Sequence, residues 1–145
     1  MVLDPNTAQG KAFARLKEVD CPNQTFLSDS EMVGRYVISL LYFILNGQNW
    51  LQSDEFLSHL QVCNWFGVKC SNELVVKLEW SSNNLNGIYS SGIPKEISQL
   101  VKLKLLDLHS NSLNSPLPES IGSMKSLREL SYILFCNHDC INGNI

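Results

Sequence analysis

The sequence predicts an α/β fold, a leucine-rich solenoid with a helical N-terminal cap and a short parallel sheet. Three observations predict it: a leucine pattern that recurs after 24 residues, an asparagine at a fixed place after that pattern, and an amphipathic segment with a helix-start signal upstream. Repeats of this length cannot bury their apolar faces alone, so they stack and share one continuous core.

The cap is expected to be built around a helix over residues 31–45. Ser28 lies three residues before Glu31, and an apolar run follows, which is the pattern of a capping box. Asn46-Gly47 is a suitable helix end. Such a helix would cover the open end of the solenoid, where core side chains and a strand edge would otherwise be exposed.

A further helix is expected over residues 8–19, with Phe13 and Leu16 as its packing residues. These elements divide the chain into an N-terminal helical or linker segment, the cap, and two and a half to three repeats that are truncated at the C-terminal end. The three parts are residues 1–30, 31–74 and 75–145.

The repeat pattern gives each of its positions a role. Leu106 and Leu108 alternate with their neighbours as in a short strand with one buried face. Asn111 stands where the chain leaves the strand, and its amide can bond backbone groups that the turn leaves unpaired. The preceding repeat matches, with Asn83 at the asparagine position and Trp80, expected in the core, where a leucine is usual. The buried leucines expected in the central repeat are Leu103, Leu106, Leu108 and Leu113.

The convex side and the third repeat are less regular. Ile121, Met124 and Leu127 are expected to continue the core along the convex side. The third repeat starts at Leu127 and needs a short insertion to align, which brings Asp139 to the asparagine position and Cys136 to a leucine position.

One face of the predicted sheet points away from the core and is the best candidate for a binding site. Alternation along each strand places side chains from three repeats next to one another on this face. The surface is small, mixed and mildly acidic, which would suit a basic or polar peptide. The alternative is a solvated face without a ligand. The side chains concerned are Lys77, Glu79, Ser81, Leu105, Asp107, His109, Glu129 and Ser131.

Composition excludes several classes of protein. The 145 residues are 44% hydrophobic, as in one ordinary globular domain. The net charge of −3 and the pI near 5.5 argue against a nucleic-acid binder, which needs a basic surface. The longest apolar run, residues 36–45, is half of the roughly 20 residues that a membrane-spanning helix needs.

Catalytic and metal-binding patterns are not found. The sequence lacks a G-x-S-x-G motif, an H-E-x-x-H motif, a P-loop and the kinase signatures, so neither enzymatic activity nor a cofactor is expected. Cys136 and Cys140 flank one histidine, but no second pair completes a tetrahedral metal set. A disulfide or two free thiols is the preferred interpretation of this pair.

Motifs of the cap and of the repeats occur together and in a fixed order. They are Asn46-Gly47-x-x-Trp50, Cys63-Asn-Trp65-Phe-Gly67-Val68-Lys-Cys70, Asn83-Asn-Leu85-Asn-Gly87, Ile93-Pro94-Lys-Glu-Ile97, Leu106-Asp-Leu108-His-Ser-Asn111-Ser-Leu113 and Pro118-Glu-Ser-Ile121-Gly122. With these motifs the chain resembles the plant-type leucine-rich repeat family, found in receptor ectodomains and secreted inhibitors of plants and in related algal proteins. The resemblance covers roughly residues 36–145. Ser115, Leu117 and Trp80 depart from the usual residues of the family.

The resemblance implies a disulfide between Cys63 and Cys70, against the alternative of two buried thiols in a cytosolic protein. Cys21 is then the odd cysteine, either free or joined to Cys136 or Cys140. Asn23 begins the N-x-[ST] sequon of the chain and is a candidate glycosylation site.

The resemblance also implies a non-catalytic function, the recognition of a protein, peptide or glycan ligand by part of a receptor-like signalling protein. The alternatives are a secreted inhibitor of a foreign enzyme, a cytoplasmic scaffold, and a truncated copy without function. The first residues lack the features of a signal peptide, and the repeats stop at Ile145 without a closing repeat. We therefore expect a fragment of a longer extracellular or secreted protein, with any membrane anchor outside this chain, or a cytoplasmic protein if the chain is complete.

Overall fold

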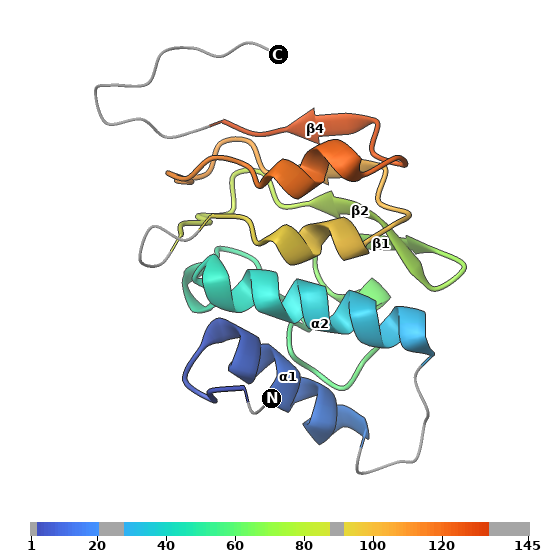
Figure 1. Cartoon of the computed structure of the whole chain (residues 1–145). Coiled ribbons are helices and arrows are strands. Elements are labelled where there is room, and N and C mark those ends of the chain that lie inside the picture. The colour runs from blue at the N-terminus through green and yellow to red at the C-terminus, as the bar shows by residue number, and fades with distance from the viewer. Residues whose placement is uncertain (1–2, 21–27, 88–91, 134–145) are drawn as a thin grey trace.

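The computed structural model describes residues 3–20, 28–87 and 92–133. The described helical elements are α1 (Ala8–Asp20), α2 (Asp29–Ile44) and the 3-10 helices η1 (Gly47–Asn49), η2 (Val62–Asn64), η4 (Lys95–Gln99) and η5 (Glu119–Ser123). Helices α1, α2, η4 and η5 stack in chain order in one layer, and the strands form a second layer beside them (Figure 1).

The sheet has four strands, which pair in the order β1-β2-β3-β4. The last three pair in parallel, as expected from the repeats. The first pairs antiparallel with the second and belongs to the cap, where the sequence analysis predicts no strand. The strands are β1 (Val68–Ser71), β2 (Leu74–Glu79), β3 (Leu105–Asp107) and β4 (Glu129–Ser131).

The cap helix α2 starts as predicted. The Ser28 hydroxyl accepts the backbone N–H of Glu31 at 3.3 Å, and the Ser28 N–H donates to the Glu31 carboxylate at 2.8 Å. The capping box is therefore complete. After the helix, Asn46 adopts the left-handed conformation with φ of 59°, which turns the chain into η1.

The packing residues of α1 differ from the prediction. Phe13 is 41% exposed, and the Lys17 ammonium lies 4.9 Å from its ring centroid, whereas Ala12 is fully buried. Leu16 is only half-buried. The methyl group of Ala12 lets α1 approach the rest of the cap more closely than a phenylalanine would, so the apolar pattern alone selected the wrong face.

The core follows the repeat pattern. Leu103, Leu106, Leu108 and Leu113 are at most 2% exposed, and Trp80 is 1% exposed. This confirms the buried positions of the central repeat and the core role of the tryptophan. In the cap, Trp50 and Trp65 are buried in the same cluster.

Two buried asparagines link successive turns of the solenoid. Asn111 Oδ1 accepts the N–H groups of Asn83 and Leu85, and its Nδ2 donates to the carbonyl of Trp80 at 2.8 Å. Asn83 Oδ1 accepts the N–H of Gln52, and its Nδ2 donates to the Gln52 carbonyl. The predicted ladder of asparagines is therefore present in these two turns.

The convex side is packed less tightly than the strand side. Ile121, Met124 and Leu127 pack against the core but remain partly exposed.

Four of the sequence predictions lie outside the described residues. They are the alignment of Cys136 and Asp139, the pairing of Cys140, the state of Cys21 and the sequon at Asn23.

A buried cation fixes the loop of the cap. Arg35, on α2, is 3% exposed and donates hydrogen bonds to the carbonyls of Ser58 and Leu60. Its guanidinium also lies 5.1 Å from the Trp65 ring centroid. The disulfide between Cys63 and Cys70 joins the same loop to β1 and confirms the pairing that the resemblance implied.

Gly34→Ala is expected to stabilise the chain by about 0.5–1 kcal/mol, because glycine inside a helix is less favourable than alanine by that amount. A Cβ at Gly34 would lie 3.5 Å from Val75 and 3.7 Å from Val62, which are ordinary contacts. Gly10→Ala is the matched control in α1, where a Cβ would lie 1.9 Å from the Asp4 carbonyl oxygen. Urea denaturation should show a higher free energy of unfolding for Gly34→Ala and a lower one for Gly10→Ala than for the wild type. Loss in both would contradict the prediction.

Candidate functional site

The strand register brings the predicted binding side chains together. Lys77 on β2 is level with Leu105 on β3, and Leu105 is level with Glu129 on β4. One step along the strands, Glu79, Asp107 and Ser131 form a second row. The intervening Leu78 and Leu106 are buried, so both rows point away from the core. We call the outward side of the sheet, formed by these two rows with Ser81 and His109, the concave face.

The concave face contains one close contact between an imidazole and a carboxylate. His109 Nδ1 lies 2.5 Å from Asp107 Oδ1, and the His109 backbone N–H donates to the same oxygen at 3.3 Å. The histidine side chain is 45% exposed and the aspartate side chain 23% exposed. The sequence placed the two on one side of a strand, and the structure brings them into contact. The pair lies on the concave face, where its polar atoms can contact a ligand.

Sequence reasoning missed one residue of this surface. Lys69 on β1 is directly opposite Lys77 on β2, and both are exposed. The sequence pattern does not predict β1, so it does not place Lys69 on this surface. The sequence signal for this hairpin is its turn, Asn72-Glu73. Both residues have positive φ in the structure. Glutamate is unusual at such a position, so the dipeptide does not identify a hairpin turn. We include Lys69 in the concave face.

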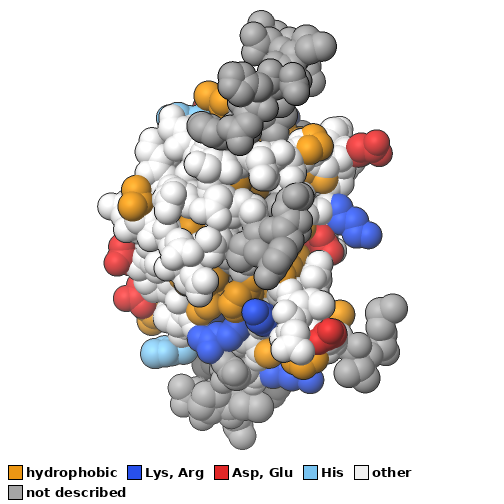
Figure 2. Space-filling model, turned by 90° about the vertical axis from the view of Figure 1, so that its left-hand side faces the viewer, with side chains coloured by type: hydrophobic (Ala, Val, Ile, Leu, Met, Phe, Trp, Pro, Cys, Tyr) orange, Lys and Arg blue, Asp and Glu red, His pale blue; other side chains and the backbone are white. Residues whose placement is uncertain are grey.

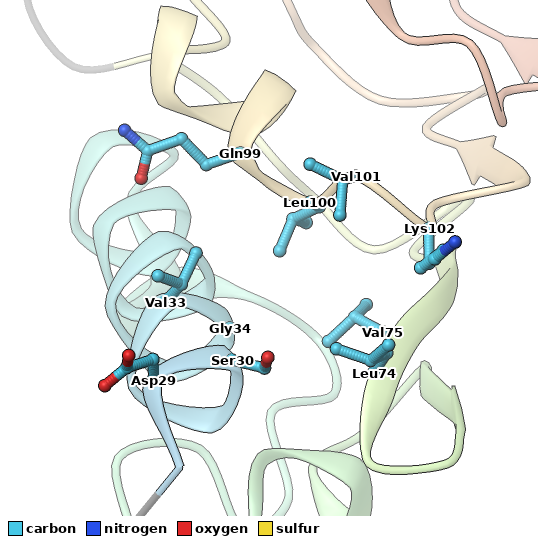
Figure 3. Close-up of a pocket in the computed structure, with 10 residues that line it drawn as sticks. All are labelled: Asp29, Ser30, Val33, Gly34, Leu74, Val75, Gln99, Leu100, Val101 and Lys102. Atoms are coloured by element: carbon cyan, nitrogen blue, oxygen red, sulfur yellow. The ribbon is translucent and has the colours of Figure 1, made fainter.

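A second feature is an apolar groove at one side of the cap. It has a volume of about 230 Å³ and lies between the first turns of α2, the start of β2 and the segment after η4 (Figure 3). Val33, Val75 and Leu100 form apolar walls, and Asp29 and Lys102 lie at the rim. No sequence pattern predicts this groove, since its walls come from three segments far apart in the chain.

The molecular surface is of mixed charge. On the side shown in Figure 2, basic and acidic side chains both occur and most of the visible surface is uncharged. Over residues 3–20, 28–87 and 92–133, no group of three or more His, Cys, Asp and Glu side chains is arranged to hold a metal ion. In the same part of the chain, no helix has the length and apolar character that crossing a membrane requires.

Tyr132, which follows β4, is expected to make stability sensitive to alkaline pH. Its hydroxyl donates to the Ser115 carbonyl, and burial raises its pKa from the ordinary 10.0 to about 12. The folded-state pKa is raised, so this stabilising contribution is fully present below pH 10 and is lost as the pH rises towards 12. Urea denaturation at pH 9 and 11.5 should show a larger loss for the wild type than for Tyr132→Phe. Equal losses would contradict the prediction.

Comparison with known proteins gives similarity to plant receptors. No family model matches the chain. A putative leucine-rich repeat receptor-like serine/threonine-protein kinase of Arabidopsis thaliana is 37% identical over 97 residues, which cover 61% of this chain and 10% of the kinase. The adenylate cyclase of Schizosaccharomyces pombe is 32% identical over 139 residues, which cover 93% of this chain and 7% of the cyclase. This chain therefore spans about a tenth or less of the length of these relatives.

Among solved structures, the leucine-rich repeat ectodomain of the receptor kinase SOBIR1 from Arabidopsis thaliana has the same fold. The TM-score is 0.53 at 23% sequence identity, and the match covers 72% of this chain and 53% of that ectodomain. The helical cap followed by short parallel strands is thus an arrangement that is known from an experimental structure.

Proposed function

Because this chain is homologous to the leucine-rich repeat ectodomains of plant receptor-like proteins, we propose that it recognises a protein or peptide ligand through its concave face and catalyses no reaction. The observation that carries the proposal is the open sheet face itself. Three strands in register present Glu79, Asp107 and Glu129 to solvent, beside the exposed lysines of β1 and β2. Side chains ordered by a rigid sheet bind a partner with little loss of conformational freedom.

We further propose that the chain belongs to the extracellular part of a longer receptor-like signalling protein. The Cys63–Cys70 disulfide supports this location, because disulfides persist in oxidising compartments and are rare in the cytosol. The share of the relatives that the chain spans, a tenth or less, supports the view that catalytic or anchoring parts lie elsewhere in such a protein.

The location is tested by mass spectrometry of the protein from its native source, digested without reduction. A peptide linked through Cys63 and Cys70 together with a glycan on Asn23 would agree with an extracellular protein. Free thiols at both cysteines and an unmodified Asn23 would contradict the extracellular proposal and favour a cytoplasmic scaffold.

The binding surface is tested with peptides selected on the purified chain from a random displayed library. We expect Leu105→Arg, at the centre of the concave face, to weaken the selected peptides at least tenfold, about 1.4 kcal/mol. Val101→Arg is the matched control, since this valine is 65% exposed and lines the apolar groove instead. Isothermal titration calorimetry measures both affinities. Peptides that lose affinity only in the Val101 variant would place recognition in the groove and contradict the proposal.

A further inference from the structure

The concave face contains two pairs of like charges in direct register. Lys69 on β1 is the partner of Lys77 on β2, and Glu79 on β2 is the partner of Asp107 on β3. Neighbouring strands are about 4.8 Å apart, and like charges directly opposite one another on a sheet are destabilising. The Nδ1 atom of the His109 ring lies 2.5 Å from Asp107 Oδ1, so the carboxylate pair has one polar contact beside it. The lysine pair and, to a smaller extent, the carboxylate pair are therefore held against their own repulsion in the free protein.

The spacing of the two pairs defines a geometry for a ligand. The lysine pair and the carboxylate pair share β2, on which Lys77 and Glu79 are two residues apart. Two residues along a strand span about 6.6 Å, and one strand step adds about 4.8 Å sideways, so the centres of the pairs are roughly 8 Å apart. In an extended peptide, side chains two positions apart point to the same side at about 7 Å. One short extended segment therefore reaches both pairs.

We propose that the concave face binds an extended peptide segment in which an acidic and a basic side chain stand two positions apart. The acidic group lies over Lys69 and Lys77, and the basic group lies over Glu79 and Asp107. Each ligand charge relieves one repulsion of the free protein, so complementarity fixes the direction of the peptide as well as its composition. The inference rests on the proposed function, because it specifies the ligand of the same face.

The repulsion in the free protein can be measured without a ligand. The Lys69→Glu substitution converts the lysine pair into an ion pair. We expect the Tm of this variant to exceed the Tm of the Lys104→Glu variant. The control makes the same change of net charge at an exposed lysine that precedes β3 and lies outside the two outward rows. Differential scanning calorimetry at low salt gives both values, since exposed charges are screened at high salt. Equal Tm values in the two variants would overturn the inference.

The ligand is tested with three synthetic pentapeptides, each blocked at both ends. The first is Gly-Glu-Ser-Arg-Gly, the second replaces both charged residues by glutamine, and the third places Glu and Arg next to each other. Amide shifts in NMR spectra of the whole chain give the affinities. We expect the first peptide to bind at least fivefold more tightly than the other two. Lys77→Gln and Glu79→Gln should remove this preference, whereas Glu119→Gln, on η5, should keep it.

The outcomes separate the inference from the proposed function. Equal binding of the three peptides, or an unchanged preference in the Lys77 and Glu79 variants, overturns the inference. The proposed function survives that result if library-selected peptides still depend on Leu105. The inference and the proposed function are both overturned if two results occur together. No peptide shifts the amides of the concave face, and Leu105→Arg binds the library-selected peptides as tightly as the wild type.

Discussion

Replacing Asn111 by alanine is expected to lower the free energy of unfolding by about 3–5 kcal/mol, because each buried polar group left without a partner costs about 1–3 kcal/mol. Its Oδ1 accepts the N–H groups of Asn83 at 3.0 Å and Leu85 at 2.9 Å. Its Nδ2 donates to the carbonyls of Trp80 at 2.8 Å and Leu108 at 3.0 Å. Alanine removes all of these bonds within a part of the chain where water does not replace them, since Asn111 is 8% exposed.

The matched control is Asn114→Ala, which removes an amide of the same size from the surface. Asn114 is exposed and accepts a long hydrogen bond of 3.4 Å from the Ser115 hydroxyl. Urea denaturation followed by circular dichroism measures both variants, and we expect less than about 0.5 kcal/mol for the control. A loss below 1 kcal/mol for Asn111→Ala would show that the ladder is not an important source of stability.

Trp80→Leu, which restores the usual residue of the repeat, is expected to destabilise the chain by about 2–4 kcal/mol, within the range for large-to-small core substitutions. The Trp80 ring lies 5.1 Å from that of Trp50 and 5.8 Å from that of Phe56, and its Nε1 donates to the Phe66 carbonyl at 2.9 Å. A Cβ on Gly67 would lie 2.5 Å from the same ring, so the indole fills space that the glycine leaves open. Leucine would leave a cavity there and an unpaired carbonyl.

Trp80→Phe separates the two contributions, because it keeps an aromatic ring and loses the indole N–H. We expect a stability between those of the wild type and the leucine variant in guanidinium denaturation. If Trp80→Leu were as stable as the wild type, the tryptophan would be an interchangeable apolar residue and not a fitted part of the interface between the cap and the first repeat.

The sequence was sufficient where a pattern is local or periodic. The capping box at Ser28 and Glu31 depends on four consecutive residues, and the burial of Leu106 and Leu108 follows from alternation along one strand. The order of the outward rows followed from the repeat period, since equivalent positions of stacked repeats become neighbours. This is why Glu79 and Asp107 could be placed side by side before the fold was known.

What the sequence could not predict depends on contacts between segments far apart in the chain. Arg35 reads as a polar interruption of the cap helix, yet it is buried because two carbonyls 23 and 25 residues away accept its hydrogen bonds. The choice of Ala12 over Phe13 as the packing residue of α1 was decided by how closely the helices approach. The position of Lys69 on the concave face could not be predicted, because its strand is defined only by its pairing with β2.

The pairing order of the sheet has a consequence for how the chain is made. Strand order in space equals strand order in sequence, β1-β2-β3-β4, so β2, β3 and β4 each pair with a strand that is synthesised before them. The antiparallel hairpin of β1 and β2, closed by a short turn, provides the template on which β3 and then β4 are laid. After this hairpin, each described repeat can add its strand to one that precedes it in the chain.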